Sequence, residues 1–220
     1  MKTNIFGILF VTLLLSLVSC NDEPEFDYGD FRSVFATFND TTATGNALLT
    51  YQAHDDSNPI QMESVNKWKL DTKKNERIYM RYTVVKSEGR DRQLIRIDGA
   101  RKINNDVLRK AEHEQYKELV SEPTRIVSLW RTGNYINLNS WVPYSGKRFN
   151  LMLIVDEITS THEIVEAKLV YDLMGSQSSF ERKCFASFDI TNLWKRENIK
   201  TFRIHVNDPK GKKIYDFTKN

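Results

Sequence analysis

From residue 31 onward, apolar and polar residues alternate in short runs, which is the pattern of half-buried β-strands. The clearest run is 78–86 (IYMRYTVVK), where Ile78, Met80 and Tyr82 share one side and Tyr79 and Arg81 the other. Turn-forming residues separate this run from its neighbours. In the first half of the chain we expect strands over 31–38, 46–54, 78–86 and 92–103.

A second series of short β runs follows Pro123. Thr132-Gly133-Asn134 and Asp208-Pro209-Lys210-Gly211 carry the residues that close hairpins. We expect strands over 125–131, 135–141, 149–155, 163–171, 180–188, 201–207 and 213–218. Such a series of strands, in about 95 residues, fits an immunoglobulin-like β-sandwich. The Cys…Trp…Cys pin of immunoglobulins is missing, so the likeness is architectural.

Between the two series lies a charged segment, 105–120, with the apolar spacing of a helix. Asp106 is placed to cap it, and Pro123 ends it. We interpret it as a short helix that connects two domains; the alternative is a helix packed within one domain. The chain then divides into a first domain over 31–120 and a second over 121–220, both all-β.

The first twenty residues have a different pattern. Lys2 precedes an uncharged apolar run over 5–18, which is typical of an export signal and too short to span a bilayer comfortably. The run ends in Leu17-Val18-Ser19-Cys20, which resembles a bacterial lipobox. We therefore expect 1–19 to be a lipoprotein signal peptide and Cys20 to be acylated. The alternative is an ordinary secretory signal with a cysteine there by chance.

Acidic residues follow this cysteine at once, in NDEPEFDYGD. Such a composition cannot bury enough apolar surface to order itself, so 20–30 is interpreted as an acidic tether. Acidic residues in this place also resemble the signal that sends lipoproteins of Bacteroidota to the outer leaflet of the outer membrane. A solvated linker that repels anionic headgroups explains the composition equally well.

Composition and charge narrow the picture further. The 220 residues are 40% hydrophobic and 28% charged with a formal charge of +3, which is ordinary for a globular protein. With Cys20 lipidated, Cys184 is the one remaining thiol, so no internal disulfide forms and the fold depends on its core. The alternation around Cys184 predicts a small buried side chain rather than a reactive thiol.

Three features carry a family resemblance: the lipobox, the acidic tether and above all RIVSLWRTGNYINL at 125–138, followed by FASFDITNLW and FRIHVND. Together they resemble the NigD-like lipoproteins of Bacteroidota. The resemblance implies an N-terminal OB-like β-barrel followed by a C-terminal immunoglobulin-like β-sandwich. Because the founding member lies in a bacteriocin operon, it also implies bacteriocin immunity as one candidate function.

No catalytic or metal-binding motif emerges. His54, His113, His162 and His205 are widely separated, and no H-E-x-x-H occurs. Asp156 and Glu157 are adjacent, so in a strand they would point to opposite faces and could not cooperate. His54-Asp55-Asp56 is interpreted as a polar loop rather than a cation site. We expect no cofactor, no metal and no enzymatic activity.

Basic residues in the first half alternate with aromatic ones, a pattern that nucleic-acid-binding proteins use. They are Arg81, Arg90, Arg92, Arg96, Arg101 and Lys102, interleaved with Tyr79 and Tyr82. Residues 24–120 nevertheless contain 16 acidic and 16 basic residues, and the chain carries an export signal. We therefore expect no nucleic acid partner.

Binding is the better supported class of function. Tyr135, Trp141 and Tyr144 cluster around the second and third strands of the predicted sandwich and are the candidate binding surface for a protein or glycan. Aromatic residues in strands more often pack in a core, which is the alternative. Asp40-Thr41-Thr42 resembles the short O-glycosylation sequon of Bacteroidota, with Thr41 as the acceptor.

These patterns favour a non-enzymatic cell-envelope lipoprotein that is held in the outer membrane through Cys20 and binds a protein or glycan outside the cytoplasm. Bacteriocin immunity is the alternative, and an envelope hydrolase the third candidate. Each buried methylene of an acyl chain contributes ~0.8 kcal/mol, so several chains would make dissociation from the membrane negligible.

The Cys20→Ser variant tests the anchor. Because serine cannot form the thioether that carries the lipid, we expect the mature chain to lose the mass of its acyl groups and to leave the detergent phase in a phase-separation assay. Mass spectrometry of the mature polypeptide measures the first effect directly. An unaltered mass together with unaltered detergent partitioning would refute lipidation at this cysteine.

Overall fold

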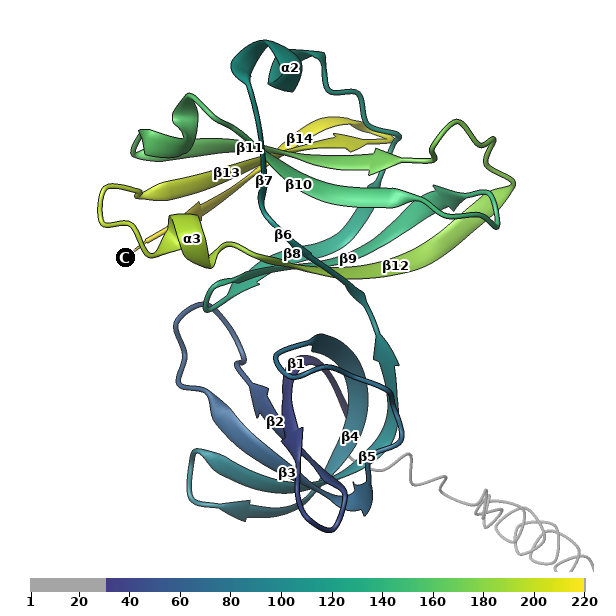
Figure 1. Ribbon diagram of the computed structural model, residues 1–220, viewed down its shortest axis with the longest axis vertical. Helices are drawn as coiled ribbons and strands as arrows, with labels where there is room; N and C mark the ends of the chain where they lie inside the picture. The colour runs from purple at the N-terminus through teal and green to yellow at the C-terminus, as the bar shows by residue number, and fades with distance from the viewer. Residues whose placement is uncertain (1–30, 220) are drawn as a thin grey trace, which may run out of the picture.

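The computed structural model describes residues 31–219. The expected signal peptide (1–19), the lipidated Cys20 and the acidic tether (20–30) lie outside the described residues. Figure 1 shows two β bodies joined by one crossing of the chain, with the N-terminal body below and the C-terminal body above. Among the described residues, no helix has both the length and the apolar character needed to cross a membrane.

The N-terminal body is a closed five-stranded barrel. Its strands are β1 (Phe31–Thr41), β2 (Asn46–Tyr51), β3 (Ile60–Lys67), β4 (Arg77–Glu88) and β5 (Arg92–Lys102). They follow one another around the barrel in the order β1-β2-β3-β5-β4, and only the β3–β5 pair is parallel. This is the five-stranded arrangement of an OB-like fold, so the barrel prediction is confirmed.

One barrel strand, β3, was not predicted from the sequence pattern. Its core-facing positions are Ile60, Met62 and Ser64, while Val65 points outward and is exposed. The alternation is therefore broken at its end, because a serine lies where an apolar residue is expected. Ser64 is tolerated in the interior since its hydroxyl accepts the N–H of Ala47 at 2.8 Å and donates to the carbonyl of Asn66.

The C-terminal body is a two-sheet sandwich. One sheet has the order β14-β13-β11-β10-β7, and the other β6-β12-β9-β8. All seven strands predicted after Pro123 are present: β8 (Arg125–Thr132), β9 (Tyr135–Tyr144), β10 (Asn150–Asp156), β11 (Ile164–Asp172), β12 (Phe180–Asp189), β13 (Thr201–Asp208) and β14 (Gly211–Thr218). A 3₁₀ turn, Thr159–Thr161, precedes β11, and a one-turn helix, α3 (Thr191–Trp194), precedes β13.

The helix expected over 105–120 is wrong over most of its length. Only α2 (His113–Glu118) is helical, whereas β6 (Asn104–Val107) and β7 (Arg109–Ala111) are strands. β6 pairs in parallel with β12 and β7 with β10, so the segment closes an edge of both sandwich sheets. Asp106, expected to cap the helix, instead accepts the N–H of Val107 and pairs with Arg109. Backbone pairing with two exposed sheet edges outweighed the helical spacing of the side chains.

Each body has its own hydrophobic core. The barrel core is built on Met62, Ile78, Met80, Tyr82 and Ile95. The sandwich core lies between its two sheets and contains Ile136, Leu138, Leu153, Phe188, Phe202 and Ile204, among others. Cys184 belongs to this second core, as the alternation predicts, and burial raises the pKa of its thiol to about 11.

A buried arginine joins the two bodies. Arg77 begins β4 in the barrel and is 4% exposed, yet none of the ion pairs among residues 31–219 includes it. Its guanidinium donates to sandwich acceptors on three strands, at 2.9 Å to Asn137 Oδ1, 3.3 Å to Ser187 Oγ and 3.4 Å to Thr132 Oγ1. It also lies 4.7 Å from the centre of the Tyr135 ring. Burial lowers the pKa of Arg77 to about 10.

The β8–β9 hairpin forms a second connection at its tip. Gly133, with φ +54, provides the left-handed backbone that the two-residue turn needs, and its N–H donates to the carbonyl of Asp55 in the barrel. Asp55 N–H in turn donates to the carbonyl of Arg131 at 3.0 Å. The Arg131 guanidinium holds both oxygens of Asp56, at 2.8 and 2.7 Å. Barrel and sandwich are therefore fixed to each other by backbone as well as side-chain bonds.

The Arg77→Ala variant tests this joint. It removes the hydrogen bonds that Arg77 donates to three sandwich strands and opens a void between the bodies, so we expect the free energy of unfolding to fall by about 3 kcal/mol. Calorimetry should show the single transition of the parent chain separating into two. Arg81→Ala, four residues along the same strand and exposed, is the control, with an expected change within about 0.5 kcal/mol. Equal stability of the two variants would show that Arg77 does not hold the bodies together.

Candidate functional site

Aromatic rings and cations gather where the barrel meets the sandwich. We call this the junction surface and define it by Phe31, Tyr79, Arg81, Arg101, Lys183 and Phe185. The first four come from barrel strands β1, β4 and β5, and the last two from sandwich strand β12. The surface therefore exists only while the two bodies hold their relative positions.

Register places the barrel side chains together. Phe31 pairs with Thr83, and the neighbouring pairs Ser33–Arg81 and Arg81–Gly99 bring β1, β4 and β5 side by side. Tyr79 lies opposite Arg101 in the same way. Since Ile78 and Met80 face the barrel core, strand alternation turns Tyr79 and Arg81 outward.

The sandwich contributes the outer face of its four-stranded sheet. Phe185 of β12 stacks on Tyr79 with ring centres 4.6 Å apart and ring planes at 9°, and Phe35 meets both rings edge to face. Lys183 lies two residues from Phe185 on the same strand, opposite Trp141 of β9, which pairs in turn with Arg125 of β8. The row Lys183, Trp141 and Arg125 thus extends the junction surface away from the barrel.

The cations are held against the rings. Arg101 lies 4.3 Å from the ring centre of Phe185 and 5.0 Å from that of Tyr79, while Arg81 lies 5.3 Å from Phe31. Lys183 Nζ is 5.3 Å from the Phe185 ring. Within residues 31–219, none of these three cations has an acidic partner, whereas Arg125 is paired with Glu181 at 2.7 Å. No carboxylate of the described part of the chain therefore neutralises their positive charge.

A shallow hollow of about 440 Å³ lies on the barrel part of the junction surface. Phe31, Tyr79, Arg81 and Arg101 line it with Ser33, Gly99 and Ala100. A Cβ at Gly99 would meet no atom within 4 Å, so the glycine leaves open space opposite Arg81. The hollow is thus walled by two guanidinium groups and floored by small residues.

The structure does not bring the three predicted binding residues together. Trp141 lies on the outer face of the sheet beside Lys183, as part of the extension described above. Tyr135 lies on the same face about 20 Å along the strand, under the Arg77 guanidinium, where burial and the nearby Asp189 raise its pKa. Tyr135 therefore belongs to the joint between the bodies.

Tyr144 belongs to a separate aromatic cluster at the end of the sandwich. Its ring packs edge to face on Phe149 and Phe180, and Arg182 lies 4.8 Å from its centre. Phe180 is 56% exposed. Strand alternation places Tyr144 on the opposite face of β9 from Trp141, so these two residues cannot form one platform.

The five-stranded sheet carries the acid–base groups. His113 Nδ1 lies 2.7 Å from Asp156 Oδ2, and His205 Nε2 lies 2.5 Å from Glu166 Oε2. The side chain of Tyr116, in α2, is buried against the sheet, where burial and the charges of Glu166 and Asp156 strongly raise its pKa. In the part of the chain that the structure describes, no group of three or more His, Cys, Asp or Glu side chains could hold a metal ion. The His113–Asp156 pair fastens α2 to β10, and the His205–Glu166 pair links the adjacent strands β13 and β11.

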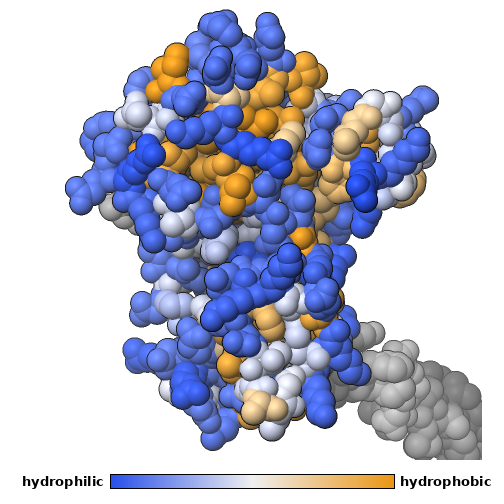
Figure 2. All heavy atoms as spheres, viewed as in Figure 1, coloured by the Kyte–Doolittle hydropathy of each residue, from blue (hydrophilic) through white to orange (hydrophobic). Residues whose placement is uncertain are grey.

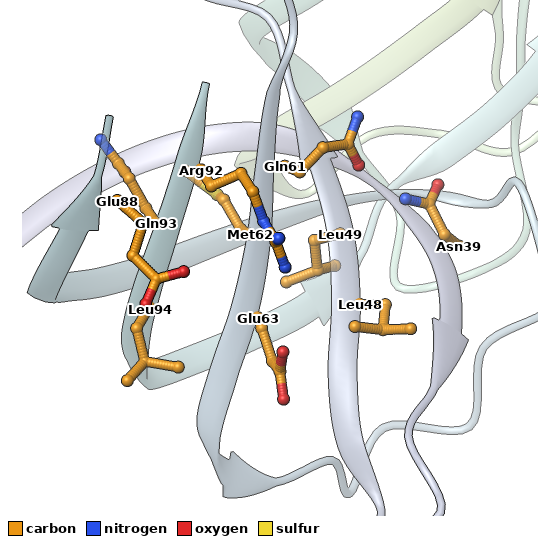
Figure 3. Close-up of a pocket in the computed structure, with 10 residues that line it drawn as sticks. All are labelled: Asn39, Leu48, Leu49, Gln61, Met62, Glu63, Glu88, Arg92, Gln93 and Leu94. Atoms are coloured by element: carbon orange, nitrogen blue, oxygen red, sulfur yellow. The ribbon is translucent and has the colours of Figure 1, made fainter. Parts of the chain in front are cut away.

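A second hollow, of about 360 Å³, lies on the outer side of the barrel over β2, β3 and β5. Figure 3 shows the side chains of these neighbouring strands around it. Its lining combines the cation Arg92 with the carboxylates Glu63 and Glu88 and with Leu48 and Leu94. The mixed charges favour no ligand of either sign, unlike the junction surface.

Apolar groups are most evident on the sandwich. Figure 2 shows hydrophobic residues gathered on the upper body in the region of β7 and β10, whereas the barrel below is more hydrophilic. Val107 at the end of β6 is 59% exposed, and Ile158 is 53% exposed.

Thr41, the predicted glycan acceptor, is an exposed residue at the end of β1. Its glycosylation stays a prediction.

The sequence contained a signal for the junction surface that pointed to another ligand. Arg81, Arg101 and Tyr79 belong to the interleaved basic and aromatic residues of the first half of the chain. Tyr82 of the same set faces the barrel core, and Arg92 lies at the second hollow. Lys183 and Phe185 could not be joined to the set, because β12 meets the barrel only in the folded chain.

Comparison with known proteins identifies the second half of the chain. A family model, the NigD-like C-terminal beta sandwich domain, matches residues 107–219. A search of curated proteins finds no match.

Solved structures share the fold over most of their length. A protein of unknown function, DUF1344, from Bacteroides vulgatus is 18% identical with a TM-score of 0.71, covering 86% of this chain and 91% of its own. A proposed lipoprotein from Bacteroides fragilis is 11% identical with a TM-score of 0.64, covering 86% and 98%. A NigD-like immunity protein from Bacteroides caccae is 16% identical with a TM-score of 0.61, covering 88% and 99%.

Proposed function

Because the chain belongs to the NigD-like family, we propose that it is a non-enzymatic lipoprotein of the cell envelope that binds a protein or glycan partner through its junction surface. The observation that carries this proposal is a set of cations, Arg81, Arg101 and Lys183, that have no acidic partner among residues 31–219 and are held on aromatic rings of both bodies. Exposed charged side chains normally are solvated by water or form ion pairs. Aromatic rings beneath such cations add apolar contact area for a ligand.

The proposed cellular location follows from the N-terminal sequence. An acylated Cys20 would attach the chain to the outer membrane, and the acidic tether over 20–30 would set the barrel off from the lipid. A fold neighbour described as a proposed lipoprotein is consistent with this location. The partner would then be a molecule of the periplasm or the cell exterior.

Crosslinking on intact cells tests the binding surface. A diazirine amino acid at position 183 should capture a partner, whereas the same group at position 195, an exposed lysine of the sandwich outside the junction surface, should not. Adding Arg101→Gln should reduce the yield from position 183 about tenfold, because charge-assisted hydrogen bonds are lost. Equal adducts from both positions, or none from position 183, would overturn the proposal.

Bacteriocin immunity is the second candidate. It is favoured by a fold neighbour described as a NigD-like immunity protein. In this case the exposed surfaces would intercept a toxin at the cell envelope.

A deletion strain separates this candidate from the first. Immunity predicts that the inhibitory concentration of the bacteriocin falls when the chain is deleted and is restored by the parent chain but not by Cys20→Ser, which would be released from the membrane. An inhibitory concentration that is the same with and without the chain would exclude immunity.

A further inference from the structure

We propose that the junction surface binds an acidic glycan, a sugar chain that carries repeated anionic groups such as carboxylates. This inference rests on the proposed function, because it names the class of ligand for the same surface.

The first argument is the number and placement of the cations. Arg81 and Arg101 wall the hollow of the barrel, and Lys183 follows on the sandwich. Between Arg81 and Lys183 the strand positions of Tyr79 and the buried Phe185, whose rings stack on each other, span about 20 Å, given 3.4 Å per strand residue. A ligand that meets every cation must therefore be extended and must carry negative charge at intervals.

The second argument is preorganisation. Each guanidinium or ammonium group is already placed against a ring, at 4.3 to 5.3 Å from a ring centre. Such placement restricts the side chain before a ligand arrives, so less conformational entropy is lost when a carboxylate binds. The N–H groups at the edge of the guanidinium remain able to donate charge-assisted hydrogen bonds.

The rings themselves disfavour neutral sugars and nucleobases. Both of these ligands bind proteins by stacking on open aromatic faces. On the junction surface a cation lies over Phe31, and Tyr79 and Phe185 stack on each other beside Arg101. The groups offered first to a ligand are therefore cations, which favour an anion.

The backbone disfavours a peptide partner. β4 is hydrogen-bonded to β1 and β5, and β12 to β6 and β9, so neither strand has a free edge at which a peptide could add as a further strand. The hollow is open and floored by Ser33, Gly99 and Ala100, and lacks the enclosed apolar pocket that anchors a protein hot spot. Recognition of a ligand therefore depends on the positively charged side chains, and the repeated negative charges of an acidic glycan complement them.

Titration calorimetry with the full lipidated chain in detergent tests the ligand class. The probes are an oligogalacturonate, a neutral galactan of equal length and poly-L-glutamate. We expect saturable binding of the oligogalacturonate alone, weakened by salt because exposed charges are screened beyond about 8 Å at physiological ionic strength. Arg81→Gln and Arg101→Gln should each weaken it about tenfold.

Charge-matched controls keep the test specific. Lys74→Gln and Lys195→Gln remove exposed cations elsewhere on the barrel and sandwich and should leave the affinity unchanged. Thermal melting of every variant checks that the fold is retained. If the controls weaken binding as much as Arg101→Gln does, the attraction is non-specific and the inference is overturned.

The remaining outcomes separate the ligand class from the proposed function. Equal or tighter binding of poly-L-glutamate would overturn the glycan in favour of an acidic protein partner and leave the proposed function standing. Equal binding of the neutral galactan would show that the cations do not select the ligand. No binding of any probe overturns the acidic glycan, while crosslinking from position 183 on cells independently decides whether the surface binds a partner at all.

Discussion

The relation between the two bodies depends on a buried arginine that no carboxylate in residues 31–219 neutralises. Transferring Arg77 out of water costs free energy, and the lowering of its pKa to about 10 is a sign of that cost. Hydrogen bonds to three sandwich strands and the face of Tyr135 offset it. Only one arrangement of barrel and sandwich provides all these partners, so a polar contact of this kind selects a geometry more than it adds stability.

That geometry is a precondition for the candidate site. Tyr79 from the barrel and Phe185 from the sandwich stack in parallel across the joint, and Arg101 reaches both rings. A small rotation between the bodies would separate the rings and with them the cations. The stretch 125–138, which carried the family resemblance, supplies the hairpin tip that fastens the sandwich to the barrel through Arg131 and Asp56. Residues of this stretch therefore form contacts between the two bodies, and Tyr135, which was expected to bind a ligand, is one of them.

The sequence predicted the strands well because side-chain alternation is a local property. The outward side of β4 shows both the strength and the limit of this reasoning. Alternation separated Tyr79 and Arg81 from the core residues Ile78 and Met80, and the structure confirms that division. It could not reveal that another domain covers part of that outward side. The failure at 105–120 has the same origin, since the edges of β12 and β10 are distant in sequence and took up the segment as β6 and β7.

By itself, the sequence determined an all-β chain with two series of strands, because hydrophobic periodicity and turn residues act over a few neighbouring positions. The OB-like barrel in the first half was implied by the family resemblance. The sequence also contained the export signal and the lipobox that predict the anchor at Cys20. The tertiary structure alone decided which aromatic residues meet which cations, and it moved the candidate surface from Tyr135 and Tyr144 to the junction around Phe185 and Arg101. Those neighbours are more than eighty residues apart in the chain, and only the packing of one body against the other brings them within 5 Å.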